Sequence, residues 1–147
     1  MRYIELSLLL GISLFNMPVT DAKIYTRCEL AKELFNSGIP KTFISNWVCL
    51  IEAESGADTS KVTELPNLST NYGIFQINSK EWCRKSRKGG ECGIRCEDFL
   101  TEDIKDDIKC AKVIYNRHGF KSWKGWMSRC KSRPLPDVSK CFGKRKK

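Results

Sequence analysis

Glu54 is the side chain in this sequence best placed to act as an acid or a base. Residues 42–55 repeat apolar side chains at helical spacing, and an advance of about 100° per residue places Glu54 within about 60° of Trp47. The glutamate therefore lies on an apolar stripe formed by Phe43, Ile44, Trp47, Leu50 and Ile51. Glu52 lies about 140° away, on the side expected to face water. Burial disfavours a charged carboxylate, so the pKa of Glu54 should rise, as a general acid requires.

The position of Glu54 also allows a purely structural role. It stands just before Gly56, where the helix is expected to end, so its carboxylate could cap the helix or form a salt bridge. Helical spacing alone does not separate this role from acid catalysis. The single histidine, His118, has no Cys, Ser or second His partner in a recognisable motif, and we interpret it as a surface residue.

Short helices and a small hairpin sheet are expected to position this glutamate. Apolar spacing predicts helices over residues 28–36 and 42–55, the first of them ended by Gly and then Pro. The alternation of residues 72–78 predicts a strand of a small hairpin sheet. A further helix is predicted after Thr101, its N-cap, because acidic residues follow in the first turn, and a last short helix over residues 123–129.

The N-terminus is typical of a secretion signal. Arg2 precedes a mostly apolar run at residues 6–15, and Thr20 and Ala22 put small residues at the two positions that signal peptidase inspects. We therefore predict a signal peptide over residues 1–22. The run is too short to span a bilayer, and nothing later approaches the roughly 18 apolar residues of a membrane helix. We expect an extracellular protein with no membrane anchor.

Composition narrows the class of protein further. The chain has 147 residues, of which 41% are hydrophobic, which suits one compact domain. Eight cysteines in a secreted chain predict four disulfides, which should hold residues 79–98 in place of a core. The net charge of +9 favours polyanionic partners. The sequence has no nucleic-acid-binding motif and no paired C-x-x-C spacing, so we expect neither nucleic-acid binding nor a zinc site.

Several segments, together with the order of all eight cysteines, match a known family. The segments are KIYTRCELA at residues 23–31, NWVC at 46–49, YGIFQINS at 72–79 and CAK at 110–112. By these motifs the chain resembles the C-type lysozymes over residues 23–142, followed by a basic tail at 143–147. The resemblance implies a lysozyme-like α+β fold, with a helical lobe and a small antiparallel sheet lobe. It also implies the disulfide pairs Cys28 with Cys141, Cys49 with Cys130, Cys83 with Cys96, and Cys92 with Cys110.

The resemblance further implies a reaction and the residues that perform it. C-type lysozymes hydrolyse the β-1,4 bond between N-acetylmuramic acid and N-acetylglucosamine in bacterial peptidoglycan, using two carboxylates with separate roles. Glu54 matches the general acid of the family, and Trp123 matches the tryptophan whose apolar wall raises the pKa of that acid. Gln76, Asn78 and Trp82 match residues that line the substrate cleft. All these roles are carried over from the family.

The chain departs from the family at the second carboxylate. Asn71 stands where the family has an aspartate before the Tyr-Gly of the sheet. A neutral amide does not readily form a glycosyl ester or offset positive charge in the transition state, so we expect hydrolysis to be slower by about 10- to 1000-fold. No nearby residue is an obvious replacement, and Glu64, in the hairpin seven positions upstream, is the only substitute base we consider. Glu81 stands where the family usually has an aromatic residue, so sugar stacking should be weaker there.

Two further motifs concern metal binding and modification. The stretch at residues 98–107 resembles the calcium loop of α-lactalbumin and of the calcium-binding lysozymes, with Asp103, Asp106 and Asp107 as matching ligands. A threonine replaces one acidic ligand, and the helix dipole also favours acidic residues at a helix start. We therefore assign no metal and no other cofactor, and keep these aspartates as calcium candidates. The sequence at residues 67–69, Asn-Leu-Ser, is a glycosylation sequon.

We interpret the chain as a secreted, monomeric, lysozyme-type glycoside hydrolase of reduced rate that acts on peptidoglycan or a related N-acetylated glycan. Two alternatives stay open. A glycan-binding protein without catalysis would explain Asn71 and Glu81 but has no need of Glu54. A cationic protein that disrupts walls or membranes would act without Glu54 and lose potency with salt. A regulatory subunit resembling α-lactalbumin is disfavoured, because that relative lacks the acid that this chain keeps.

Overall fold

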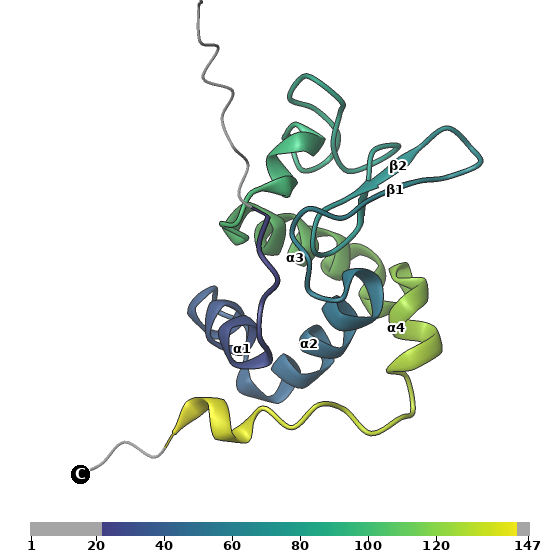
Figure 1. Ribbon diagram of the computed structural model, residues 1–147. Helices are drawn as coiled ribbons and strands as arrows, with labels where there is room; N and C mark the ends of the chain where they lie inside the picture. Colours follow the sequence, from purple (N-terminus) through teal and green to yellow (C-terminus); the bar gives the residue numbers. More distant parts are fainter. Residues whose placement is uncertain (1–21, 144–147) are drawn as a thin grey trace, which may run out of the picture.

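The computed structural model describes residues 22–143 (Figure 1). The predicted signal peptide up to residue 21 and the predicted basic tail from residue 144 lie outside the described residues. The fold places helices on one side of the molecule and a small sheet on the other, from which the hairpin of strands β1 and β2 projects. This is the predicted α+β architecture with two lobes.

Four α-helices form the helical lobe. They are α1 (Arg27–Asn36), α2 (Lys41–Ser55), α3 (Lys105–His118) and α4 (Lys124–Arg129). Helix α1 begins in a capping box, in which the Thr26 hydroxyl and the Glu29 carboxylate each accept a hydrogen bond from the other's backbone N–H. Helix α2 ends at Gly56, whose φ of 63° closes the helix. The helices predicted over residues 28–36, 42–55 and 123–129 are confirmed to within one residue.

The predicted N-cap at Thr101 is wrong. A short 3₁₀ helix, η1 (Cys96–Leu100), ends at Thr101, and α3 begins only at Lys105, after Ile104. The Thr101 hydroxyl donates a hydrogen bond to the backbone carbonyl of Asp103 at 3.0 Å, so it stabilises the connection instead of the helix start. The first turn of α3 does contain acidic residues, Asp106 and Asp107, but Glu102 and Asp103, which would have followed an N-cap at Thr101, precede the helix.

Three short antiparallel strands form the sheet in the order β1 (Val62–Glu64), β2 (Thr70–Tyr72), β3 (Ile77–Asn78). The strand predicted over residues 72–78 is interrupted, because Gly73 and Gln76 have φ values of 72° and 51° and form a turn between β2 and β3. Alternation of side chains did not reveal this turn. The register places Asn71 opposite Thr63 on one side and opposite Asn78 on the other.

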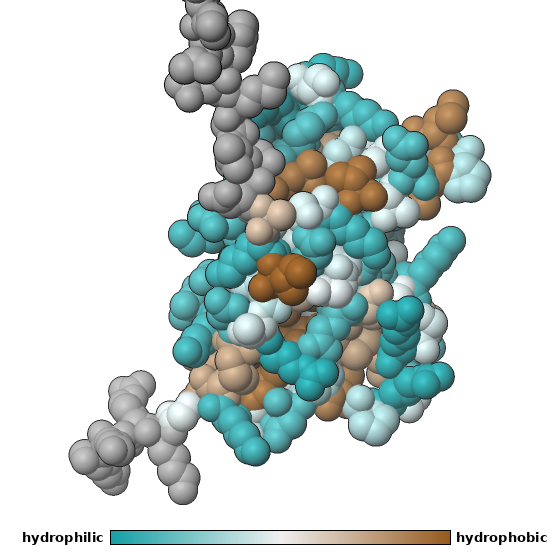
Figure 2. Space-filling model, viewed as in Figure 1, coloured by the Kyte–Doolittle hydropathy of each residue, from teal (hydrophilic) through white to brown (hydrophobic). Residues whose placement is uncertain are grey.

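Trp47 of α2 lies at the centre of the core. Its ring centroid is 5.1 to 5.9 Å from those of Phe75, Tyr115, Phe120 and Trp123, so residues distant in sequence converge on one indole. Phe43, predicted on the same stripe, is instead 43% exposed beside a shallow hollow at the surface. Figure 2 shows a mostly hydrophilic face with an apolar protrusion at the tip of the β1–β2 hairpin, where Leu68 is 91% exposed.

All four predicted disulfides are present: Cys28–Cys141, Cys49–Cys130, Cys83–Cys96 and Cys92–Cys110. The second joins α2 to α4, and the last two hold the irregular segment after the sheet, as expected from its lack of a core of its own. Between residues 22 and 143, no helix has the length and apolar character needed to cross a membrane.

Candidate active site

A cleft of about 250 Å³ brings the predicted site residues together. It is lined by all six of them: Glu54, Asn71, Gln76, Asn78, Trp82 and Trp123. The glutamate comes from α2, the two asparagines come from β2 and β3, and Trp123 precedes α4. The cleft is therefore walled by both lobes.

The carboxyl group of Glu54 is partly buried in this cleft. Burial raises its pKa above the ordinary value of 4.5, against an opposing effect of the Gly125 backbone N–H, which donates to Oε1 at 2.6 Å, and of the Lys61 charge. The carboxylate forms no ion pair with any residue between 22 and 143. The backbone N–H groups that act on it, those of Gly125 and Trp126, belong to α4 and not to the end of its own helix. These contacts favour an acid held for proton transfer over a helix cap.

Trp123 forms an apolar wall of the same cleft. The residue is 4% exposed, and its indole Nε1 donates a hydrogen bond to the backbone carbonyl of Phe75 at 2.9 Å. This bond satisfies the only polar atom of the ring and fixes its orientation. The indole lines the same cleft as Glu54, whose pKa is raised by burial.

Asn71 is held by its neighbour across the sheet. Nδ2 of Asn78 donates to Oδ1 of Asn71 at 2.7 Å and also to the hydroxyl oxygen of Ser69 at 2.9 Å. The amide nitrogen of Asn71 has no hydrogen-bond partner among residues 22–143. The cleft therefore offers a neutral amide at position 71, with its oxygen already occupied by a hydrogen bond.

Gln76 lines the cleft but has little free hydrogen-bonding capacity. Its Nε2 donates to the carbonyls of Lys61 and Gly73 at 3.0 and 2.9 Å, and its Oε1 accepts from the Thr63 hydroxyl at 2.6 Å. The side chain is 7% exposed. Gln76 thus shapes the cleft floor by fixing the turn between β2 and β3. Local sequence patterns did not indicate this role, because it depends on contacts made across the sheet.

Neither Glu64 nor Glu52 lines the cleft that holds Asn71. Glu64 does not line the cleft, and its charge acts instead near Tyr72, whose pKa is raised by burial and by Glu97, with a smaller effect from Glu64. Glu52 points away from the cleft and pairs with Arg27 at 2.6 Å. The predicted outward direction of Glu52 is confirmed.

Glu81 and His118 lie close together near Trp82. The Glu81 carboxylate is 3.9 Å from Nε2 of His118, and the His118 ring meets the Trp82 ring edge-on at 5.9 Å. His118 is exposed, as predicted, but its proximity to Trp82 was not expected from sequence. The place expected for a sugar-stacking aromatic is therefore occupied by the Glu81 carboxylate, with His118 between it and a buried indole.

The aspartates proposed as calcium ligands do not converge. Asp107 is fully buried with neither carboxylate oxygen hydrogen-bonded, and burial raises its pKa well above the ordinary value of 3.8. Asp103 is exposed and lies 3.8 Å from the ammonium of Lys105. From residue 22 to residue 143, no group of three or more carboxylate, imidazole or thiol side chains is gathered closely enough to hold a metal ion. The residues as arranged do not fit a calcium site.

Comparisons with known proteins agree with this geometry. Residues 23–141 match the family model of the C-type lysozyme/alpha-lactalbumin family. The chain is 50% identical to Lysozyme c-1 of Anopheles gambiae, over 84% of this chain and 89% of that relative. It is 47% identical to a lysozyme of Bombyx mori, over 83% of this chain and 89% of that relative. It is similar in structure to canine milk lysozyme, with a TM-score of 0.71 and 38% identity over 77% of this chain and 93% of that one. It is also similar in structure to lysozyme from Equus asinus, with a TM-score of 0.70 and 35% identity over 76% of this chain and 92% of that one.

Proposed function

Because this chain belongs to the C-type lysozyme/α-lactalbumin family, we propose that it is a secreted glycoside hydrolase that cleaves the β-1,4 bond between N-acetylmuramic acid and N-acetylglucosamine in bacterial peptidoglycan. The observation that carries the proposal is the partly buried carboxyl of Glu54, with a raised pKa, in a cleft walled by Trp123. A carboxyl group that stays protonated longer than usual is able to donate a proton to a leaving oxygen. The protein acts outside the cell, as a monomer, with the wall glycan as its partner.

In this mechanism Glu54 donates its proton to the glycosidic oxygen as the bond from that oxygen to the anomeric carbon breaks. The bonding electrons stay with the oxygen, and positive charge develops at the anomeric carbon. A water molecule then adds to that carbon, and the Glu54 carboxylate takes up the proton that the water releases. Asn71 contributes only the dipole of its amide to the charged transition state, so we expect a rate lower by about 10- to 1000-fold than an aspartate would give.

The test measures release of reducing ends from purified peptidoglycan at low salt, over pH 4 to 8. Wild type is compared with Glu54→Gln and Asn71→Asp. Cleavage that disappears in Glu54→Gln supports a slow muramidase with Glu54 as its acid. If the wild type releases no reducing ends while Asn71→Asp does, hydrolysis is not the natural function of this cleft.

A second function, glycan binding without cleavage, is favoured by Asn71 together with Glu81 at the sugar-stacking position. Binding of soluble N-acetylglucosamine oligomers by wild type and by Glu54→Gln separates the two functions. A pure binder would hold the oligomers intact through prolonged incubation, and with equal affinity in both proteins.

A further inference from the structure

The segment that follows the sheet carries a high concentration of positive charge. Residues 80–88, here called the basic loop, contain five cations and one carboxylate: Lys80, Glu81, Arg84, Lys85, Arg87 and Lys88. None of these cations forms an ion pair with another residue of the described chain. Their charge is available to an external anion.

Most of these cations border one concave surface. Lys80, Arg84, Lys85 and Arg87 line a hollow of about 450 Å³, here called the basic hollow, together with Ser79 and the turn of the β1–β2 hairpin at residues 67–69. Several ammonium and guanidinium groups around one concavity suit a ligand with more than one negative charge.

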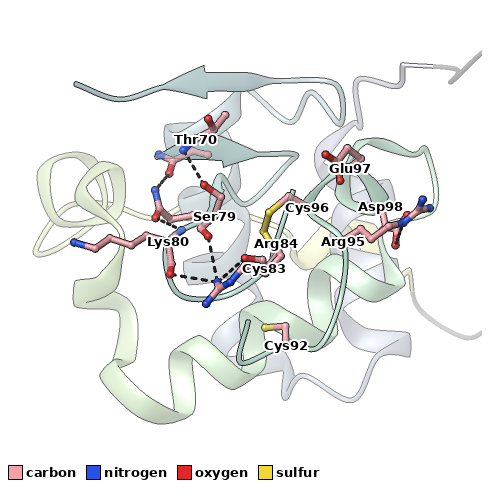
Figure 3. The surroundings of a disulfide bond; sticks show 12 residues. Thr70, Ser79, Lys80, Cys83, Arg84, Cys92, Arg95, Cys96, Glu97 and Asp98 are labelled. Atoms are coloured by element: carbon pink, nitrogen blue, oxygen red, sulfur yellow. Dashed lines mark hydrogen bonds and ion pairs between the residues drawn. A yellow bond between two sulfur atoms is a disulfide. The ribbon is translucent and has the colours of Figure 1, made fainter. Parts of the chain in front are cut away.

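Arg84 is fixed by the backbone of the basic loop. Its Nη1 donates to three backbone carbonyl oxygens, those of Ser79, Lys80 and Cys83, at 2.8 to 3.3 Å (Figure 3). Its aliphatic stem lies against Gly89, where an added Cβ would come within 2.5 Å of Cγ of Arg84. The guanidinium is therefore already ordered before a ligand binds, which lowers the entropic cost of binding.

The turn at residues 85–87 is also held in shape. Ser86 has a φ of 61°, and its backbone N–H donates to both carboxylate oxygens of Glu97, at 3.0 and 3.1 Å. The disulfide Cys83–Cys96 ties the two segments together one residue away from Glu97 (Figure 3). The carboxylate of Glu97 is thus engaged by the backbone, and it offsets only part of the charge of the turn.

A third hollow lies between the basic hollow and the active-site cleft and borders both. This hollow of about 710 Å³ shares Asn78 with the cleft and shares Lys80 and Arg84 with the basic hollow. The three concavities therefore follow one another along the sheet lobe. A glycan strand bound in the cleft would bring its substituents close to the basic loop.

We propose that the basic hollow binds the phosphodiester chain of an anionic polymer carried by the bacterial wall. The inference rests on the proposed function, because that function is the reason to expect a wall glycan in the neighbouring cleft. A phosphodiester chain repeats its negative charge at short intervals, so it contacts several fixed cations at once and releases their counterions. Guanidinium groups bind phosphate through paired N–H donors and ammonium groups bind it as point charges.

The chain contains its own matched control for this proposal. The tripeptide Lys-Ser-Arg occurs at residues 85–87 and again at 131–133, and its serine has a positive φ in both places, 61° and 56°. All four flanking cations are exposed. The double variants K85A/R87A and K131A/R133A therefore remove equal charge from equivalent turns, but only the first pair lines the basic hollow.

The experiment measures binding of purified poly(glycerol phosphate) by calorimetry at several salt concentrations. The protein comes from a host that adds no N-linked glycan, because Asn67 borders the hollow. We expect K85A/R87A to weaken binding roughly 10-fold and to flatten its salt dependence, and K131A/R133A to weaken it by less than about 2-fold.

Equal losses in the two double variants, or no binding by the wild type, would overturn the proposal. Vesicles containing phosphatidylglycerol provide a second arm. If K85A/R87A weakens vesicle binding but leaves polymer binding intact, the hollow serves a lipid surface and the proposal is overturned. Binding is measured on the polymer alone, so this result is independent of whether the protein cleaves peptidoglycan.

Discussion

Asn78 donates a hydrogen bond from Nδ2 to Oδ1 of Asn71 across 2.7 Å, and the two residues are directly paired between β3 and β2. An aspartate at position 71 would offer the same acceptor oxygen to the same donor. Its second oxygen would take the place of an amide nitrogen that has no partner among residues 22–143. The sheet is therefore arranged to accept a carboxylate here without moving its neighbours.

Asn71→Asp is accordingly expected to raise kcat for peptidoglycan by about 10- to 1000-fold with little change in KM, because the added charge acts mainly in the transition state. Steady-state release of reducing ends checks this. Asn116→Asp, an exposed position on α3, adds the same charge away from the cleft and should leave kcat unchanged. A rise in both variants would assign the effect to net charge.

The pH dependence of wild-type kcat/KM should have one limb only. Burial raises the pKa of Glu54 above 4.5, and the acid must be protonated, so activity should fall as the pH rises through that raised pKa. Asn71 does not titrate, so no loss is expected at low pH while the protein stays folded, as followed by circular dichroism.

In Asn71→Asp the profile should become bell-shaped, because the new carboxylate must be ionised to act. A bell-shaped profile in the wild type would mean that another carboxylate already serves as the base. The variant Glu64→Gln would then test whether Glu64 is that base. If it is, the variant should no longer lose activity at low pH.

Local sequence patterns predicted those parts of this site that depend on one helix. The period of α2 placed Glu54 on the buried side and Glu52 on the other, as observed. The break between β2 and β3 was not predicted, because it is enforced by Gln76, whose side chain bonds to Lys61 and Thr63 from an earlier strand region. The shape of the basic loop likewise depends on Glu97, which alternation and helical spacing do not bring into view.

Asp107 should make the protein less stable as the pH rises. Burial puts its folded-state pKa well above the unfolded value, near 3.8. The group therefore contributes its full stability below about pH 4, and this contribution is lost as the pH rises toward and through the folded pKa. Asp107→Asn does not titrate, so its free energy of unfolding should vary less between pH 4 and 8 than that of the wild type.

Chemical unfolding at several pH values, with a chelator present, measures this difference. Asp106→Asn is the matched control, since Asp106 is the adjacent residue and is exposed, and its profile should follow that of the wild type. Identical profiles for all three proteins would contradict the prediction. If calcium raises the melting temperature of the wild type and not that of Asp107→Asn, the aspartates rearrange around a cation after all.

Gly73, directly after β2, has no room for a side chain. An added Cβ would lie 2.2 Å from the backbone carbonyl oxygen of Phe99, and the residue has a φ of 72°. Gly73→Ala should therefore lower the free energy of unfolding by roughly 2–4 kcal/mol, from backbone strain and displacement together. Gly93, at φ 63° with open space around its Cβ position, separates the two causes, because Gly93→Ala should cost only about 1 kcal/mol. Urea unfolding of both variants would show the difference, and equal losses would mean that φ alone determines the cost at Gly73.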